Sequence, residues 1–114
     1  MGQELKPPLT PAVFFTLFGL AGGDKHGYAI MQEARSLSDG SFQMGPATLY
    51  TTLQRLLDFG LIQEVPSSGV EDARRRVYTL TRPGRELLEG ELARIESMLR
   101  KARPLRARLG HVKP

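Results

Sequence analysis

The residues best suited to chemistry in this chain lie on one face of a predicted helix between Gly45 and Ile62, in the stretch GPATLYTTLQRLLDFGLI. Polar side chains recur there at helical spacing: Thr48, Thr51, Gln54, Arg55 and Asp58. Glutamine and arginine can read purine edges in a major groove, whereas threonine hydroxyls more often bind phosphates. The face therefore indicates contacts with double-stranded DNA, although polar helix faces that only meet solvent are also common.

The opposite face of the same stretch explains why it should be a helix. Leu49, Leu53 and Leu56 recur at steps of four and three residues, which predicts an amphipathic helix with a buried stripe. Pro46 suits the first helical position, and Gly60 suits the left-handed residue that ends a helix.

Two further helices are expected before this one. Residues 1–9 are polar, contain Pro7-Pro8 and are expected to form an extended arm. Thr10 is a good helix cap and Pro11 a good first residue, so the first helix should run from there to about Ala21. Its aromatic and aliphatic side chains are interpreted as core rather than as a cofactor site.

The second helix is expected from His26 to Leu37, after a break at residues 22–25. Its buried side should carry the apolar residues Tyr28, Ile30, Met31, Ala34 and Leu37. His26 is interpreted as a cap or packing residue at the helix start, against the alternatives of a ligand or a pH sensor. Gly27 is expected to let two backbones approach. After a turn at residues 39–41, Phe42 and Met44 alternate with polar neighbours, which is compatible with a very short strand.

A β-hairpin is predicted behind the third helix. The strand candidates are residues 61–65 and 75–80, and a Pro/Gly/Ser turn followed by acidic residues joins them. Arg74, Arg75 and Arg76 lie where the chain enters the second strand. Arginines at that position can bind phosphates, and each such contact adds counterion release, although arginine triplets are often only surface. This hairpin would be the wing of a winged helix-turn-helix.

The last predicted helix spans roughly residues 82–103, with Thr81 as its cap. Its apolar residues form a heptad seam: Leu88, Leu92, Ile95, Leu99 and Ala102. A second copy of the chain is the simplest cover for this seam, and the first helix is the alternative; both can hold together. Pro104 should end or kink the helix, which leaves residues 105–114 as a basic mobile tail.

Composition narrows the class of protein. The chain has 114 residues, a net charge of +4, a pI near 9.9 and no cysteine. It contains no nucleophile motif, no phosphate-cradling glycine loop and no His/carboxylate cluster at metal spacing, so we expect no enzyme, no cofactor and no metal. Its longest apolar run is too short to span a bilayer, and a cytoplasmic protein without membrane contact is expected.

The expected fold class is mainly α with a small β-hairpin: a winged helix-turn-helix plus a long C-terminal dimerisation helix. The expected units are residues 1–81 for DNA binding, residues 82–104 for dimerisation and residues 105–114 as the tail. The alternative is a winged-helix adaptor that contacts proteins and never binds DNA. An adaptor would be expected to show apolar residues on the third helix, where polar ones stand.

A resemblance sharpens this interpretation. The chain resembles the PadR family of bacterial transcriptional regulators over about residues 10–85, in the following stretches: His26-Gly27-Tyr28, Pro46-Ala47-Thr48-Leu49-Tyr50, Leu53 with Leu56, Gly60-Leu61-Ile62, and Arg76-Val77-Tyr78-Thr79-Leu80-Thr81 with Gly84. The resemblance implies a homodimeric repressor on an inverted-repeat operator, dimerised by its C-terminal helix. It also implies that Thr48, Tyr50 and Thr51 face DNA, that Arg75 and Arg76 form a basic wing, and that a small hydrophobic or aromatic effector can bind between the dimer's helices.

Two departures from the family pattern bear on the wing. Glu71 and Asp72 at the predicted tip would repel phosphate, so the tip is not expected to enter the minor groove. Phe59 stands where the family usually has a charged residue, and it either packs on the wing or is exposed.

Overall fold

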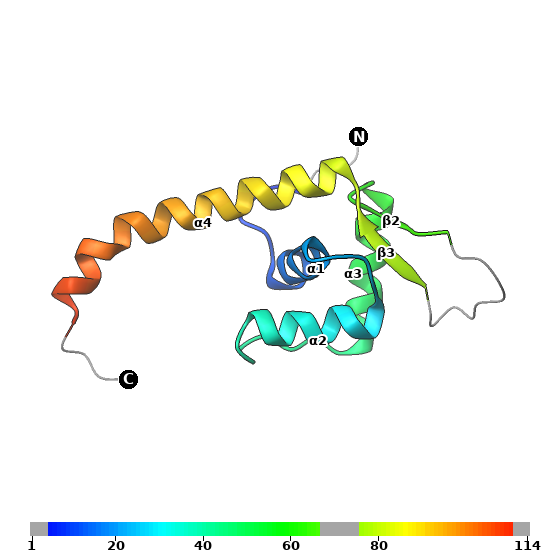
Figure 1. Cartoon of the computed structure of the whole chain (residues 1–114), viewed down its shortest axis with the longest axis horizontal. Coiled ribbons are helices and arrows are strands. Elements are labelled where there is room, and N and C mark those ends of the chain that lie inside the picture. The colour runs from blue at the N-terminus through cyan, green and yellow to red at the C-terminus, as the bar shows by residue number, and fades with distance from the viewer. Residues whose placement is uncertain (1–4, 67–75, 111–114) are drawn as a thin grey trace.

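A computed structural model gives the fold and describes residues 5–66 and 76–110 (Figure 1). The elements in chain order are α1 (Pro11–Ala21), β1 (Lys25–His26), α2 (Gly27–Leu37), α3 (Pro46–Asp58), β2 (Ile62–Glu64), β3 (Val77–Leu80) and α4 (Arg82–Arg108). This is the predicted order of helices and hairpin, with one additional short strand. The fold class expected from the sequence is therefore confirmed.

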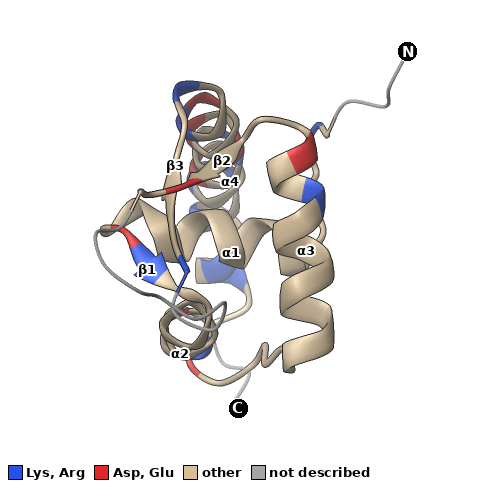
Figure 2. Cartoon of the chain, turned by 90° about the vertical axis from the view of Figure 1, so that its right-hand side faces the viewer, with Lys and Arg blue, Asp and Glu red and all other residues tan. Residues whose placement is uncertain are grey.

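Helix α1 is the centre of the molecule. The side chain of Thr10 accepts a hydrogen bond from the backbone N–H of Val13 at 3.3 Å, and Pro11 takes the first turn, as predicted. Leu17 is fully buried, and α1 contacts α2, α3, α4 and β3. Figure 2 shows α1 between α2 and α3, with the β2–β3 strands and α4, seen end-on, above it. One shared core thus holds the other helices in place.

The three strands form one antiparallel sheet in the order β1-β3-β2. Ile62 pairs with Leu80 and Glu64 with Tyr78, which confirms the predicted hairpin. Strand β1, paired through Lys25 with Tyr78, was not predicted, because two residues are too few to show an alternating pattern.

The possible strand at Phe42 and Met44 is wrong, since residues 42–45 have no regular secondary structure. The Ser38 hydroxyl donates to the carbonyl of Phe42 at 3.1 Å and accepts from its N–H at 3.0 Å. Both backbone groups of Phe42 are satisfied locally and are not available to a strand partner. Its ring stacks on Phe15, with 5.4 Å between centroids.

Helix α2 begins one residue later than predicted, because His26 is its cap. The imidazole Nδ1 of His26 accepts from the N–H of Ala29 at 3.4 Å, as the capping interpretation predicted. Two expectations nearby are wrong. Tyr28 is 61% exposed rather than core. Gly27 does not allow two backbones to approach: a Cβ there would meet the Tyr50 hydroxyl and a methyl of Leu49, so the close neighbours are side chains.

Helix α3 has the predicted amphipathic form. Leu49, Leu53 and Leu56 are buried, and the polar residues on the opposite face are exposed. Gly60 has a φ of +74° and ends the helical segment, as predicted for the left-handed residue. The chain then enters β2 directly, which places the hairpin against the end of α3.

Helix α4 is longer than predicted. Thr81 caps it by accepting from the N–H of Gly84 at 3.2 Å, as expected. A Cβ on Gly84 would collide with the carbonyl of Leu61, so glycine permits the close approach of α4 to the start of the hairpin. The helix continues through Pro104 to Arg108, so the expected end near residue 103 is wrong, and residues 105–108 belong to the helix rather than to a mobile tail.

Helix α4 can continue through Pro104 because this end of the helix is exposed to solvent. Proline removes one helical hydrogen bond and crowds the carbonyl four residues earlier, at a cost of roughly 3 kcal/mol in a helix interior. Residues 103–108 are all exposed, so water can satisfy the carbonyl that proline leaves without a donor. Figure 1 shows the orange-red end of α4 bending away from the line of its first turns. Pro104 was predicted either to end the helix or to kink it, and the bend agrees with a kink.

Candidate nucleic-acid interface

The outer face of α3 presents hydrogen-bonding groups with little net charge. Thr48, Thr51 and Gln54 are exposed, as predicted. Arg55 and Asp58 are the only charged residues of this helix, and Figure 2 shows them near one end. The amide of Gln54 donates to the carboxylate of Asp58 at 3.0 Å, which orients the amide on the helix surface. A face of this kind binds by short, directional hydrogen bonds rather than by bulk charge.

Tyr50 occupies the flank of α3 nearest the start of α2. It is 44% exposed, and its hydroxyl lies over Gly27. Adding a side chain to Gly27 would displace this ring. The position of Tyr50 on α3 therefore depends on the absence of a side chain at Gly27, which gives the glycine of the stretch His26-Gly27-Tyr28 a structural role.

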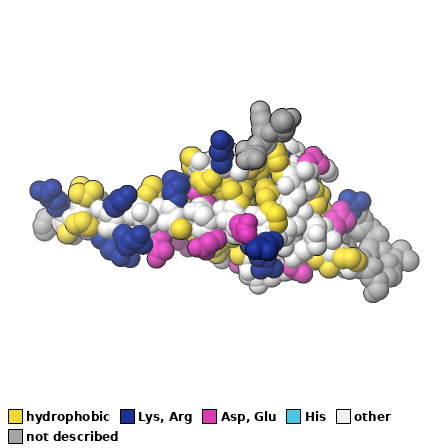
Figure 3. Space-filling model, turned by 90° about the horizontal axis from the view of Figure 1, so that it is seen from above, with side chains coloured by type: hydrophobic (Ala, Val, Ile, Leu, Met, Phe, Trp, Pro, Cys, Tyr) yellow, Lys and Arg dark blue, Asp and Glu magenta, His cyan; other side chains and the backbone are white. Residues whose placement is uncertain are grey.

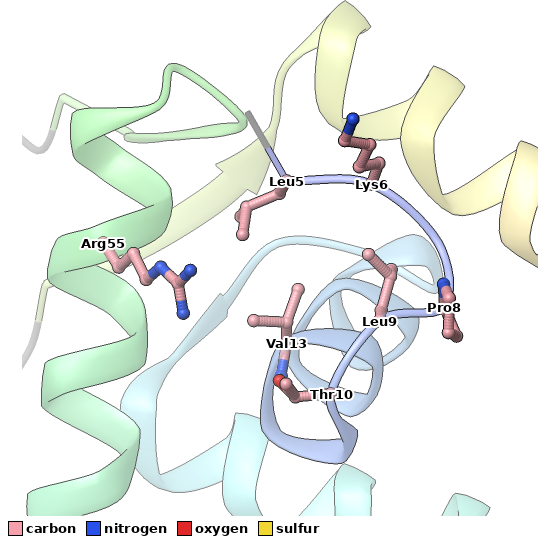
Figure 4. A pocket seen from close by; sticks show the side chains of 7 residues that line it. All are labelled: Leu5, Lys6, Pro8, Leu9, Thr10, Val13 and Arg55. Atoms are coloured by element: carbon pink, nitrogen blue, oxygen red, sulfur yellow. The ribbon is translucent and has the colours of Figure 1, made fainter. Parts of the chain in front are cut away.

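Arg55 lies on the other flank of α3 and turns toward the core side. Its guanidinium carbon is 6.0 Å from the centroid of the Phe59 ring, within the range of a cation–π contact. Figure 4 shows the side chain reaching toward Leu5 and Val13. These residues line a cavity of about 230 Å³ beneath the arm that precedes α1. Among the predicted DNA contacts on α3, Arg55 is the one that the structure directs away from the outer face.

Phe59, whose position the sequence left open, is half-buried and packs against the hydrophobic core. It lies under Arg55 instead of being fully exposed. It also lines a shallow hollow of about 520 Å³ on α3, together with Tyr50, Thr51, Gln54, Arg55 and Asp58. The Phe59 ring thus makes part of this hollow apolar, at a position where the PadR family usually has a charged residue.

The described part of the predicted wing begins at Arg76, which directly precedes β3. Arg76 is 3.4 Å from the carboxylate of Glu64 on the neighbouring strand, and both side chains are about half exposed. Burial raises the pKa of Tyr78 beside them, and the negative charge of Glu64 adds to that increase. Arg76 therefore remains accessible to a phosphate but is already partly neutralised.

Residues 67–75 of the predicted wing lie outside the residues that the structure describes, and four of them carry predicted roles. They are Arg74, Arg75, Glu71 and Asp72, so their roles stay predictions.

The exposure of one residue of α2 was not predicted. Tyr28 stands at the start of α2 on the same face as Gln32 and Arg35, which follow at helical steps of four and three residues and are exposed too. This helical spacing from two polar residues could have predicted that Tyr28 is exposed, but tyrosine was counted with the apolar residues. Lys25, by contrast, donates to the carbonyls of Gly19 at 2.7 Å and Gly23 at 3.2 Å, so its ammonium is tied to the last turns of α1 and the loop that follows.

The predicted seam of α4 divides into two parts. Leu88 is buried in the chain's own core and Leu92 packs against it, so the first part is covered by the same chain. Ile95 and Ala102 are half-buried, and Leu99 is 42% exposed. Figure 1 shows this second part of α4 projecting beyond the body. The chain's own core therefore covers the first part of the seam, and cover by a second copy stays a prediction for the second part.

An ion pair between buried Glu91 and partly exposed Arg94 stabilises the first part of α4. Glu91 is only 2% exposed, and its carboxylate accepts two hydrogen bonds from Arg94, at 2.7 and 3.0 Å. It also accepts from the backbone N–H of Leu9 at 3.0 Å, which ties the arm to α4. The hydrogen bonds from Arg94 hold the pKa of Glu91 below its ordinary value, against the opposing effect of burial. The charged form thus fastens the entry into α1 onto α4.

Residues 5–66 and 76–110 hold no group of three or more His, Cys, Asp or Glu side chains placed to bind a metal ion. None of the helices described is both long and apolar enough to cross a membrane.

The arrangement defines a class of protein. Helices α2 and α3, the β2–β3 hairpin behind them and the supporting α1 form a winged helix-turn-helix. The sequence model of the transcriptional regulator PadR-like family matches residues 17–90. The chain belongs to this family of transcriptional regulators.

Individual relatives agree with this assignment. Over 80 residues, 70% of this chain, the sequence is 39% identical to a 37.1 kDa protein of transposon Tn4556 from Streptomyces fradiae. The matched part spans only 21% of that longer protein. A PadR family transcription regulator from Clostridium difficile has the same fold, with a TM-score of 0.67 and 22% identity over 84% of this chain and 98% of that one.

A third relative carries information about DNA. The structure of Bacillus subtilis PadR in complex with operator DNA aligns with a TM-score of 0.60 and 24% identity. The alignment covers 70% of this chain and 45% of that one. At this identity the likeness establishes the fold, and the DNA contact belongs to that protein.

Proposed function

We propose that this chain is a sequence-specific DNA-binding repressor that acts as a homodimer on an inverted-repeat operator. The observation that carries the proposal is the outer face of α3, where Thr48, Thr51 and Gln54 are exposed beside the start of the wing. Hydroxyl and amide groups on a helix of this width fit the hydrogen-bonding pattern of a major groove. The operator complex of the Bacillus subtilis relative supports the same use of the fold.

The basic residues at the start of the wing would bind the DNA backbone. Arg74, Arg75 and Arg76 follow one another in the sequence at the entry to β3. Phosphate contacts fix the register of a protein on the duplex without reading its sequence. In this proposal, α3 supplies specificity and the wing arginines supply affinity.

Helix α4 would serve two purposes. Its first turns complete the core around Leu88, so residues 1–81 need them to form the DNA-binding unit. The remaining turns, with Ile95, Leu99 and Ala102, would bind the second copy and set the spacing between two half-sites. A small hydrophobic or aromatic effector that binds between the helices of the dimer would alter this spacing and release the operator.

Selection of binding sites from random duplex DNA tests the proposal. An enriched inverted repeat with a fixed half-site spacing is the expected result. A pool that is retained in a salt-sensitive way without enrichment would contradict sequence-specific recognition. A pool that is not retained at all would favour a winged-helix adaptor that contacts proteins.

A further inference from the structure

The described part of the arm, residues 5–9, connects α4 with the end of α3. At one end of it, the backbone N–H of Leu9 donates to the buried carboxylate of Glu91 in α4 at 3.0 Å. Leu5 and Leu9 are half-buried and pack against the hydrophobic core. Figure 4 shows Leu5 on the side of the arm that faces Arg55 of α3. The arm is therefore fastened to α4 and reaches α3 without belonging to either helix.

Arg55 is the residue of α3 that meets the arm. Its side chain and those of Leu5 and Val13 line the same cavity of about 230 Å³. Its guanidinium carbon lies 6.0 Å from the centroid of the Phe59 ring. The methylene stem of an arginine packs favourably on apolar surface. The docked arm thus supplies part of the apolar surface that favours the inward orientation of Arg55.

The backbone of Arg55 nevertheless lies on the outer side of α3. Arg55 follows Thr51 by four residues and Thr48 by seven, so the three Cβ atoms lie along one flank of the helix. All three residues are exposed. Exposed side chains change rotamer in picoseconds to nanoseconds, so a turn of the guanidinium needs no change in the backbone. An outward Arg55 would stand beside Thr48 and Thr51.

We propose that Arg55 is a conditional phosphate contact and that the arm controls it. The docked arm holds the guanidinium inward, and release of the arm lets it turn to a phosphate of the DNA backbone. The inference rests on the DNA-binding function proposed above and adds a control of the same face. Arginine binds phosphate through charge-assisted hydrogen bonds, and each such contact makes the affinity more dependent on salt. Glu91 is a positioning residue in this scheme, because its hydrogen bond to Leu9 keeps the arm in place.

A double-mutant cycle on non-specific duplex DNA tests this control. Leu5→Ser with Leu9→Ser removes the apolar contacts of the arm and changes no charge. In this arm variant, the slope of log affinity against log salt should be about one unit steeper than in the wild type, and Arg55→Gln should restore it. In the wild-type background, Arg55→Gln should leave the slope nearly unchanged, because the guanidinium is held inward. The difference between the two backgrounds is the coupling energy of the arm with Arg55.

Two further variants make the cycle specific. Phe59→Leu keeps an apolar side chain but removes the aromatic face near Arg55, so it should also steepen the slope while the arm stays intact. Figure 3 shows basic side chains on the projecting end of α4, and Arg100 is an exposed arginine of that end. Arg100→Gln removes the same charge as Arg55→Gln and should have an equal effect in both backgrounds. Thermal unfolding of every variant checks that it folds.

The outcomes separate the inference from the proposed function. If Arg55→Gln flattens the slope equally in the wild type and in the arm variant, Arg55 contacts phosphate with the arm docked, and the inference is overturned. If Arg55→Gln has no effect in the arm variant or in Phe59→Leu, Arg55 contacts no phosphate, and the inference is overturned as well. A wild-type chain that duplex DNA does not retain at any salt concentration would contradict the proposed function itself.

Hydrogen exchange at Leu9 provides a second test, which needs no variant. Coupling between two equilibria is reciprocal, so if release of the arm favours DNA binding, DNA binding must favour release of the arm. The N–H of Leu9 donates to Glu91 only while the arm is docked, and its exchange rate rises with the open fraction. The exchange of this amide should therefore be faster in the complex with duplex DNA than in the free protein. An equal or slower rate in the complex would overturn the inference.

Discussion

Helix α3 and the free end of α4, residues 95–108, each expose one face, and the side chains on the two faces differ in chemistry. On α3 the exposed groups are hydroxyls, an amide and a single pair of opposite charges. On the free end of α4 they are large apolar side chains between basic ones. Hydroxyl and amide groups form short directional hydrogen bonds and distinguish one base from another. Neighbouring exposed apolar side chains are typical of a surface that binds another apolar surface.

The difference separates two tasks that one helix would perform poorly. In the proposed function, the face of α3 must keep its polar groups accessible to the bases, and the face of α4 must exclude water. In this chain, α3 is held only through its leucine side, whereas α4 is held through its first turns and left free beyond them. Changes to one helix should therefore affect DNA preference, and changes to the other should affect association.

The largest expected effect comes from the buried side of α3. Leu53→Ala should reduce the free energy of unfolding by about 2–5 kcal/mol, because Leu53 is 1% exposed within the core. The neighbouring change Gln54→Ala should alter it by no more than about 0.5 kcal/mol, since that side chain is exposed. Urea unfolding of the two variants checks the contrast. Equal losses would contradict the assignment of the two faces.

The next effect concerns association. Leu99→Glu should weaken dimerisation by roughly 2–3 kcal/mol, about 30- to 100-fold, because it places a charge on the proposed interface. Its folding should be unaffected, as Leu99 is exposed within one chain. Sedimentation over a range of concentrations measures the change, with Gly90→Glu as a control in an open part of the same helix. A Leu99→Glu chain that dimerises like the wild type would rule out this face.

The third effect concerns the buried link between the arm and α4. Glu91→Gln should lower the free energy of unfolding by about 1.5–3 kcal/mol at neutral pH, as expected for hydrogen bonds to a charged group. Because the folded pKa of Glu91 lies below the ordinary value of 4.5, its carboxylate stabilises the fold above that pH. The contribution is lost as the pH falls through the lowered folded pKa.

Unfolding experiments at several pH values test this sign. The difference in stability between wild type and Glu91→Gln should be largest above pH 4.5 and shrink on acidification. Glu89→Gln, on the exposed side of the same helix, is the matched control and should show little difference. A difference for Glu91→Gln that grows toward low pH would refute the account.

The smallest effect belongs to the start of the wing. Arg76→Ala should weaken binding to all DNA sequences alike and reduce the salt slope by about one unit, as for one lost phosphate contact. Glu64→Gln should strengthen binding, because it removes the carboxylate 3.4 Å from Arg76. Gel shifts at several salt concentrations measure both. An unchanged slope for Arg76→Ala would remove this residue from the interface.

The sequence was sufficient to predict α1, α3 and the hairpin, because each has a cap or a terminating residue and a clear apolar period. Thr10, Gly60 and Thr81 took the roles predicted from their types alone. Local patterns succeed where the interactions that decide the structure are local.

The errors fall where distant residues decide the outcome. The neighbours of Gly27 are side chains of α3, Leu49 and Tyr50, which no local pattern reveals. Strand β1 exists because β3 provides a partner far along the chain. Pro104 failed to end α4 because that end is surrounded by solvent. The direction of Arg55, toward the arm instead of outward, likewise depends on Phe59 and the cavity beneath Leu5.

The most direct test of the central claim is selection of binding sites with a variant of the α3 face. Gln54→Ala should bind non-specific DNA as the wild type does but enrich a different base at one position in each half-site. Each well-formed amide contact contributes about 1–3 kcal/mol of discrimination. Gln32→Ala, which removes the same exposed group from α2, is the control and should leave the profile unchanged. Identical profiles for wild type and Gln54→Ala would contradict base reading by this face of α3.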